Sequence, residues 1–241
     1  IHMGDIFDSR KSIDYQSLEW SKKVVFDPLR KYKVYAITGN HDCYYKNTNY
    51  VNSPELLLRA YPNIKLYSKA TEIEIDKLKI LMLPWINPEN QEESFNMLNT
   101  AEADICMAHL DLNGFYMHEN ITQTHGYDKS IVKRFEKTIT GHFHTKNDDG
   151  QIFYLGSQYE MTWSDYNVKK YFHVFDTETR ELEAIHNPFT IFAKLVYNDD
   201  EINYDEFDIS PYHNKFVKLV VVNKKNNEMF DRLLERLYHK I

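Results

Sequence analysis

Gly39-Asn40-His41-Asp42 follows directly on the β-branched and aromatic run at residues 33–38, and this stretch decides how the chain is interpreted. We interpret the run as a strand and the four residues as a turn at its carboxyl end, where glycine permits a sharp bend. The three side chains after the glycine offer an amide oxygen, an imidazole and a carboxylate, which suit a metal ion and a proton transfer. A polar turn whose aspartate caps the backbone is the structural alternative.

The size and composition predict a globular protein with a large core. The chain has 241 residues, of which 42% are hydrophobic and 15% aromatic, enough for one large domain or a domain with an appendage. Its 29 basic and 36 acidic residues give a formal charge of -7, so we do not expect it to coat nucleic acid without regard to site. If it handles DNA, local basic patches or bound cations must face the phosphates.

Cysteine usage and hydropathy indicate the compartment. Cys43 and Cys106 are the two cysteines, and their spacing fits neither a metal nor a redox motif, so we expect a reducing environment. No window approaches the roughly 18 apolar residues of a membrane span, and no signal sequence opens the chain. These features predict a cytoplasmic protein with no membrane partner.

Three further predicted strand ends carry the same kind of side chain. Asp5 follows the strand tail at residues 1–3, His109 follows a strand at 104–108, and Gly141-His142-Phe143-His144 follows a strand at 137–140. Side-chain direction alternates along a strand, so His142 and His144 would point to one side. Ligands of open α/β sheets bind at the carboxyl ends of strands, where these residues would converge.

Each of these residues also has a purely structural interpretation. Asp5 could be a turn carboxylate, and His109 alone would more often be a hydrogen-bonded core histidine. Four successive strand ends of the same chemistry favour a site instead. Two divalent ions about 3.5–4 Å apart need a bridging carboxylate with nitrogen and amide-oxygen ligands, and the chain supplies these types.

The remaining elements are predicted from periodicity and turn residues, with a domain boundary after His186. The helix from Asp14 should be capped by that residue and kinked at Pro28, and Ser53-Pro54 should start the next helix. The expected domains are 1–186 and 187–241. The other expected helices are 55–60, 89–98, 129–135 and 227–239, and the expected strands are 64–67, 71–75, 79–83, an antiparallel meander of 151–155, 170–175 and 180–185, then 190–197 and 215–222.

Taken in order, Gly4-Asp5, Gly39-Asn40-His41-Asp42, His109 and Gly141-His142-Phe143-His144 resemble the signature of the calcineurin-like metallophosphoesterases. The stretches GDIFDSRK (4–11), GNHDCYYKN (39–47) and HLDLNGF (109–115) resemble SbcD-type DNA repair nuclease subunits, most of all those of T-even phages. This resemblance implies a mixed α/β fold, a four-layer αββα sandwich with a small α/β capping domain. If the chain is phage-encoded, the host cytoplasm is the expected location.

The resemblance also implies residue roles in a two-metal phosphodiesterase that uses manganese or, alternatively, magnesium. Asp5 would bridge both ions and His144 would hold the first. His41 would be the catalytic imidazole that protonates the leaving oxygen, and Asp42 would orient it. The ligands of the second ion would be Asn40, His109 and His142.

The chain departs from the family pattern at its start. The family's first motif, an Asp and a His two residues apart on the first strand, has no match before Gly4. His2 lies on the strand that carries Asp5, so it does not substitute. We therefore expect the sequence as given to be truncated at its amino terminus, to bind the first ion poorly and to be weak or inactive as a nuclease.

The end of the chain is locally basic. Residues 211–241 contain seven basic and three acidic side chains, whereas residues 176–208 contain two basic and ten acidic ones. In the resembled family the small domain contacts DNA, so Lys224 and Lys225 are candidate phosphate contacts, with a solvated helix face as the alternative for Arg232 and Arg236.

The predicted function is a metal-dependent DNA nuclease subunit of a recombination and repair complex, acting as an exonuclease on duplex ends and an endonuclease on single strands. The resemblance implies DNA, an SMC-like ABC ATPase and a second copy of the chain as partners. A small-substrate phosphatase or nucleotide phosphodiesterase of the same fold is one alternative, because a fold does not fix its substrate. A catalytically inert DNA-binding adaptor is the other.

Overall fold

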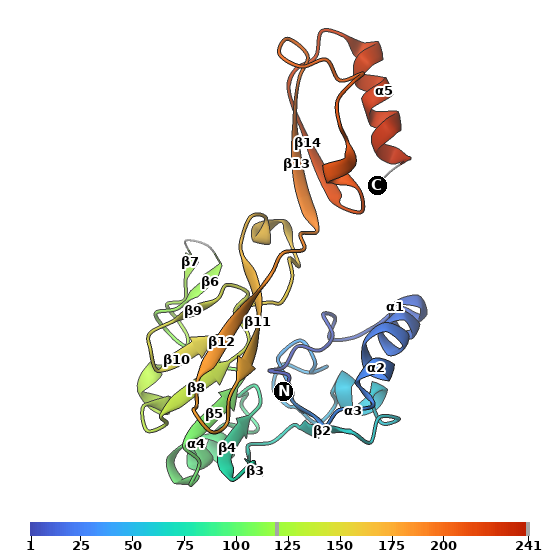
Figure 1. Cartoon of the computed structure of the whole chain (residues 1–241). Coiled ribbons are helices and arrows are strands. Elements are labelled where there is room, and N and C mark those ends of the chain that lie inside the picture. The colour runs from blue at the N-terminus through green and yellow to red at the C-terminus, as the bar shows by residue number, and fades with distance from the viewer. Residues whose placement is uncertain (119–120, 240–241) are drawn as a thin grey trace. The chain divides into compact units, whose positions relative to one another are not determined.

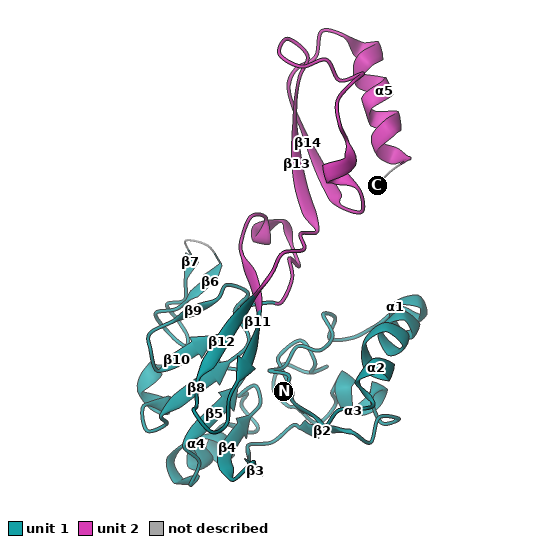
Figure 2. Cartoon of the chain, in the orientation of Figure 1, with its two compact units in different colours: residues 1–157, 172–185 teal, residues 158–171, 186–241 magenta. Residues whose placement is uncertain are grey.

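The computed structural model describes residues 1–118 and 121–239 (Figure 1). The chain divides into two compact units: unit 1 is Ile1–Ser157 with Phe172–Ile185, and unit 2 is Gln158–Tyr171 with His186–Ile241 (Figure 2). Residues 158–171 precede the boundary expected at His186 and group with unit 2. In the described part of the chain, no helix combines the length and apolar character that a membrane span needs.

A six-stranded sheet forms the centre of unit 1, in the order β3-β4-β5-β8-β10-β9. Neighbours among β4, β5, β8 and β10 are parallel, and β3 and β9 are antiparallel edges. The strands are β3 (Thr71–Ile75), β4 (Leu78–Leu83), β5 (Ile105–Ala108), β8 (Lys137–Thr140), β9 (Asn147–Asp148) and β10 (Ile152–Tyr154).

The register of this sheet brings three strand ends level with one another. Leu83 is opposite Ala108, and Ala108 is opposite Thr140. The residues that follow these positions therefore leave the sheet at the same edge. This is the edge at which His109 and His142 emerge.

A second layer of strands covers one face of the central sheet. It consists of the parallel pair β1 (Val34–Ile37) and β2 (Ile64–Tyr67), and the pair β11 (Lys170–Phe175) and β12 (Leu182–Asn187). Buried Ile37 of β1, and Phe175 and Leu182 of the other pair, pack in the same apolar cluster as Ile80 and Met107 of the central sheet. The two layers therefore share a core.

The predicted three-stranded meander at 151–185 is wrong. Only β11 and β12 pair with each other, whereas β10 joins the central sheet parallel to β8. The side chains of Ile152 and Tyr154 are almost fully buried in the core of that sheet. Burial of this apolar pair explains why β10 lies inside the sheet and not at an antiparallel closing edge.

Helices cover the two outer sides of unit 1. Leu98 of α4 (Gln91–Thr100) and Val132 of η2 (Lys129–Val132) pack on the free face of the central sheet. On the other side, Phe26 and Leu58 pack near β2. The expected four-layer α/β sandwich is thus confirmed. The helices on the β2 side are α1 (Tyr15–Ser21), the π-helical turn η1 (Lys22–Phe26), α2 (Asp27–Leu29) and α3 (Ser53–Leu57). Separately, the short strands β6 (Tyr116–His118) and β7 (Ile121–Thr122) pair with each other.

The helix caps differ slightly from expectation. Asp14 caps α1 as predicted, since its carboxylate accepts a hydrogen bond from the Ser17 backbone N–H at 2.8 Å. The cap of α3 is Asn52, one residue before the expected Ser53, because its Oδ1 accepts from the Glu55 N–H at 2.9 Å.

Unit 2 is a small α/β unit. Its parallel strands β13 (Phe192–Asn198) and β14 (Phe216–Asn223) pack with α5 (Asn227–Tyr238) around buried Tyr197, Tyr204 and Leu233. Tyr204 donates its hydroxyl to the Val196 carbonyl and stacks on Tyr197. The short helices η3 (Trp163–Asp165) and η4 (Ser210–Tyr212) complete the unit.

A buried ion pair holds the 158–171 segment of unit 2. Lys170 Nζ lies 2.6 Å from Asp165 Oδ1, and the two side chains are 3% and 2% exposed. Asp165 Oδ2 also accepts from the backbone N–H groups of Met161 and Thr162. Burial alone would raise the pKa of Asp165, but the bonds from Lys170 and from these amides lower it overall.

Replacing Asp165 by asparagine should destabilise unit 2 by about 3–5 kcal/mol, because it leaves the Lys170 ammonium buried without its counter-charge. The folded-state pKa of Asp165 is lowered, so its contribution is present above the unfolded value of about 4 and is lost as the pH falls through the folded value. Urea unfolding of the two proteins at pH 7.5 and below pH 4 measures this. An equally large difference in unfolding free energy at the lower pH would contradict the role given to Asp165. The control is Glu228→Gln, which removes only an exposed ion pair with Arg232.

Candidate metal centre

Four side chains meet at one point: Asn40, His109 and His142 follow the strands β1, β5 and β8, and Asp5 follows an isolated bridge between His2 and Ala36 of β1. Asn40 Oδ1 lies 2.9 Å from His109 Nε2 and 2.9 Å from His142 Nδ1, and these two ring nitrogens are 3.2 Å apart. Asp5 Oδ2 lies 3.3 Å from His109 Nε2. The ligand atoms of Asp5, His109 and His142 all fall within 4.8 Å of one another, a spacing that one metal ion can bridge.

The tautomer of His109 fits this arrangement. Its Nδ1 lies 2.7 Å from the Met3 carbonyl, which can only accept, so Nδ1 carries the hydrogen in a neutral ring. Nε2 then presents a lone pair toward the oxygens of Asn40 and Asp5. A backbone carbonyl behind the second nitrogen is the usual partner of a metal-ligating histidine. The donor set therefore fits a divalent cation.

The charges of the cluster also suit a cation. Burial and the neighbouring His109 lower the pKa of His142 to about 3, so that ring is neutral and able to ligate at neutral pH. Burial opposes ionisation of Asp5, but charge and hydrogen bonding from His109 leave the pKa of Asp5 well below its usual value. Burial likewise opposes protonation of His109, yet the Asp5 carboxylate raises the pKa of that ring overall, so a cation bound here would compete with the proton.

Two of the ligand residues have a backbone conformation that side-chain-bearing residues rarely adopt. The φ angle is 55° at Asp5 and 85° at His142. Such a conformation costs about 1–3 kcal/mol and persists where the surroundings enforce it, typically at functional sites. Both side chains are thereby turned toward the cluster, His142 shortly after the end of β8.

Three glycines make room for these side chains. A Cβ atom on Gly39 would overlap the Asp5 carboxylate, one on Gly4 would overlap the His109 ring, and one on Gly141 would overlap the Met3 carbonyl. The chain does turn at residues 40–42, directly after Gly39, but the φ of this glycine lies outside the left-handed region. Its requirement is close approach to Asp5.

His41 lies beside the cluster and is not part of it. Its backbone N–H donates to Asp5 Oδ1 at 2.7 Å, while its ring Nδ1 donates to the Asp8 carbonyl at 2.7 Å. The side chain is 45% exposed. The carbonyl of Asp8 fixes the ring and leaves Nε2 to carry a second proton.

Asp42 binds backbone amides, as in the structural alternative considered for this turn, and not the His41 ring. Its fully buried carboxylate accepts from the backbone N–H groups of Asp5 and Gly39 on Oδ2, both at 2.8 Å, and from those of Ile6 and Phe7 on Oδ1, at 2.9 and 3.2 Å. No bond to the His41 ring occurs among the contacts of the described residues. Burial raises the pKa of Asp42 to about 6, against the effect of the Gly39 amide.

His144 lies outside the three-residue ligand group of the described chain. Its ring packs edge-on against that of His118, with the centroids 5.8 Å apart. The structure thus brings Asp5, Asn40, His109 and His142 together, while the part of His144 in a first-ion site stays a prediction.

The lysines proposed for DNA contact have partners within unit 2. Lys225 Nζ lies 2.7 Å from Asp200 Oδ1, and Lys224 Nζ lies 4.6 Å from the centre of the Phe230 ring. The Lys225 and Asp200 side chains are 71% and 46% accessible, and Lys224 is exposed while Phe230 is half-buried. Both lysines are therefore accessible to a ligand, and each also contacts a neighbouring side chain of unit 2.

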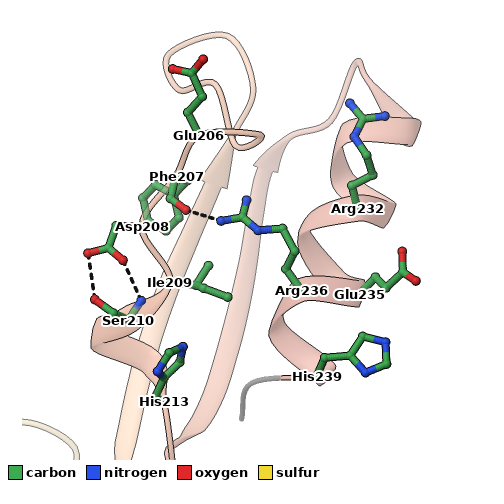
Figure 3. A pocket seen from close by; sticks show the side chains of 10 residues that line it. All are labelled: Glu206, Phe207, Asp208, Ile209, Ser210, His213, Arg232, Glu235, Arg236 and His239. Carbon is green, nitrogen blue, oxygen red and sulfur yellow. Dashed lines mark hydrogen bonds between the residues drawn. The ribbon is translucent and has the colours of Figure 1, made fainter.

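A cavity of about 750 Å³ lies between α5 and the loop before η4 in unit 2 (Figure 3). Arg236 reaches across to this loop and donates to the carbonyls of Tyr204 and Phe207, both at 2.6 Å. Arg232 pairs with Asp205 at 2.7 Å. These two arginines hold the loop to the helix and so are not simply part of a solvated helix face. The residues that line the cavity include none of the metal-ligand candidates.

The sequence did not indicate two groups that position the site. The carbonyls of Met3 and Asp8 hold the rings of His109 and His41, and a main-chain oxygen leaves no mark on the residue type that carries it. The glycines Gly4 and Gly141 could be recognised in the sequence, because each stands directly before a candidate ligand, Asp5 or His142.

The comparisons with known proteins agree with this site. The model of the calcineurin-like phosphoesterase family matches residues 1–146, which contain all the ligand candidates, and the chain belongs to this family. It is 34% identical over 245 residues to Exonuclease subunit 1 of Enterobacteria phage T4, an alignment that covers all of this chain and 70% of that protein. The predicted family is thus confirmed.

Replacing Asp42 by asparagine should lower the free energy of unfolding of unit 1 by about 3 kcal/mol at pH 8, where the carboxylate is ionised. Each carboxylate oxygen of Asp42 accepts two backbone N–H groups, and in asparagine an NH₂ group would replace one of these oxygens and face both donors. Hydrogen bonds to a charged group contribute about 1.5–3 kcal/mol each. Urea unfolding followed by circular dichroism measures the loss. Asp8→Asn, a change at an exposed carboxylate, is the control, and equal stability of the two variants would argue against the role given to Asp42.

Proposed function

We propose that this chain is the nuclease subunit of a larger assembly and hydrolyses phosphodiester bonds of DNA with the help of divalent cations. The observation that carries the proposal is the convergence of Asp5, Asn40, His109 and His142 beside an exposed His41. The name of the phage relative, an exonuclease subunit, supports both DNA as the substrate and a partner protein.

Divalent cations, when bound, supply positive charge that polarises a phosphate and lowers the pKa of water. Asn40, His109, His142 and one oxygen of Asp5 would hold one ion, and Asp5 with His144 would contribute to a second. Manganese is the proposed metal, since a set of imidazole, amide and carboxylate donors suits it, and magnesium is the alternative.

The chain itself supplies the proton for the leaving group. The Asp8 carbonyl fixes Nδ1–H of His41, so a protonated ring can donate from Nε2 to the departing 3′ oxygen. The Asp5 carboxylate accepts the backbone N–H of His41 and therefore couples the position of this ring to that of the ligands. His41 needs no metal of its own in this mechanism.

Further partners belong to the proposal. An SMC-like ABC ATPase and a second copy of the chain follow from the resemblance to SbcD-type subunits, and the relative named as a subunit supports an assembly. The basic segment of unit 2 supports DNA contact through Lys224 and Lys225, the proposed role of residues 187–241 as a capping domain.

The variant His41→Asn of the full-length protein should lose Mn²⁺-dependent cleavage of linear duplex and single-stranded DNA by about 10²–10⁴-fold, because the leaving oxygen then departs without a proton. Its Mn²⁺ affinity, measured by isothermal titration calorimetry, should stay within about threefold, since His41 is no ligand.

A phosphomonoester such as p-nitrophenyl phosphate is the matched control substrate. If the protein hydrolysed the monoester well and left DNA intact, it would be a small-substrate phosphatase and the nuclease proposal would be wrong. Loss of Mn²⁺ binding in His41→Asn would separately contradict the role given to this ring.

The double variant Lys224→Ala, Lys225→Ala should bind DNA more weakly and reduce the slope of log affinity against log salt by about 1–2, because each phosphate contact releases about one counterion. Fluorescence anisotropy at several salt concentrations measures the slope. Lys133→Ala in unit 1 is the control. An unchanged slope would remove both lysines from the interface.

A further inference from the structure

The residues of the candidate metal centre come from two different sheets. Asn40 and His41 follow β1 of the two-stranded sheet, whereas His109 and His142 follow β5 and β8 of the central sheet. Hydrogen bonds along a strand fix positions within one sheet only. The placement of the 39–43 turn against the histidines therefore depends on contacts between the two sheets at this edge.

Asn49 makes such contacts with both sheets. Its side chain is buried, and its Nδ2 donates to the Ser68 carbonyl at 3.1 Å and to the Trp85 carbonyl at 3.3 Å. Ser68 directly follows β2, and Trp85 lies two residues beyond β4. One amide group thus joins the carboxyl end of one sheet to that of the other.

The oxygen of the same amide contacts the 39–43 turn. Asn49 Oδ1 accepts from Cys43 Sγ at 3.0 Å and from Asn87 Nδ2 at 2.8 Å. Cys43 directly follows Asp42 and is itself fully buried. Asn87 belongs to the loop after β4, so Asn49 Oδ1 binds both this loop and the 39–43 turn.

The chemistry of the position requires an amide. Two of its partners are carbonyls, which only accept, and the other two are a thiol and an NH₂ group that donate to it. All four hydrogen-bonding positions of Asn49 are used. A carboxylate of the same shape would face both carbonyl oxygens without a donor. An apolar residue would remove all four bonds, and the Trp85 carbonyl and the Cys43 thiol would keep only their contacts with Asn90 and Gly39.

We propose that Asn49 is a positioning residue for catalysis: it sets the distance between the 39–43 turn and the histidines of the central sheet, and so keeps His41 aligned with the leaving oxygen. This proposal rests on the nuclease function proposed above. Asn40 has its own contacts with His109 and His142, whereas the far end of the turn, at Cys43, is tied by Asn49. Loss of Asn49 should accordingly disturb the proton donor more than the metal ligands.

The test compares Asn49→Ala and Asn49→Asp with wild type in the full-length protein, with the exposed Asn47→Ala as the matched control. With DNA and Mn²⁺, both Asn49 variants should lose about 10- to 100-fold in kcat, with KM within about threefold, because a misplacement of about 1 Å suffices for such a loss. With bis(p-nitrophenyl) phosphate, whose leaving group needs no proton, kcat should fall by less than about threefold. Equal losses on both substrates would overturn the proposal, since they indicate damage to the fold and not to proton donation.

Amide hydrogen exchange gives a readout that needs no activity. In Asn49→Ala, the amides of residues 39–43 should exchange at least about tenfold faster, while those of β5 stay as in wild type. Unchanged exchange in the turn would overturn the proposal even if the wild type cleaved no DNA, so its failure is distinguishable from failure of the proposed function.

Cys43→Ala is a milder variant that keeps the contacts between the sheets and removes only the thiol donor. It should show the same pattern with a smaller, roughly two- to fivefold loss of kcat on DNA. No loss in this variant, together with a folded but fully active Asn49→Ala, would exclude the positioning role.

Discussion

The buried carboxylate of Asp42 is the constraint on which the rest of the site depends. Its two oxygens accept four backbone N–H groups, three from the turn that carries Asp5 and one from Gly39. Hydrogen bonds to an ionised acceptor in a water-excluded position are short and strong, so these two turns behave as one body. The two candidate ligands Asp5 and Asn40, 35 residues apart in sequence, are thereby fixed relative to each other.

The remaining ligands are fixed by strand register instead. Ala108 and Thr140 are opposite each other, so His109 and His142 leave neighbouring strands at one level. The left-handed conformation of His142 then turns its ring back toward Asn40. The cost of this strained conformation is offset by β8 behind it, and that at Asp5 by the bonds of residues 5–7 to the Asp42 carboxylate, which is the arrangement expected of a preorganised site.

Sequence reasoning found the ligand candidates because residue type and position at a strand end are local properties. His109 and His142 each follow a β-branched or apolar run that forms a strand of the parallel sheet, whereas Asp5 follows only a short bridge to β1. What it missed depends on distant partners. The contacts of Asp42 with the amides of residues 5–7, the close approach of Gly39 to Asp5 and the carbonyl behind His109 leave no local trace in the sequence, because each joins segments 34 to 106 residues apart.

The errors in the fold have the same origin. The run at 151–155 alternates like a half-exposed strand, yet it lies between β8 and β9, since the buried pair of Ile152 and Tyr154 fits the core better than an edge. Local pattern gives a strand's faces, but the neighbour that it pairs with follows from packing alone. The grouping of residues 158–171 with unit 2 follows from distant contacts too: Glu160 accepts the N–H groups of Ile191 and Phe192, and Trp163 packs against the Phe192 ring.

The charge distribution of unit 2 bears on how an acidic chain can contact phosphate. Lys225 pairs with Asp200 and Arg232 with Asp205, so neither cation is without a counter-charge. Exposed pairs of this kind contribute only about 0–1 kcal/mol, because water and salt screen them. A phosphate can therefore replace the carboxylate of Asp200 at little cost in direct interaction energy, and the gain comes from the counterions that the nucleic acid releases. Affinity for DNA in such a unit must then depend more steeply on salt than the stability of the unit itself does, since the intramolecular pairs re-form whenever the phosphate leaves.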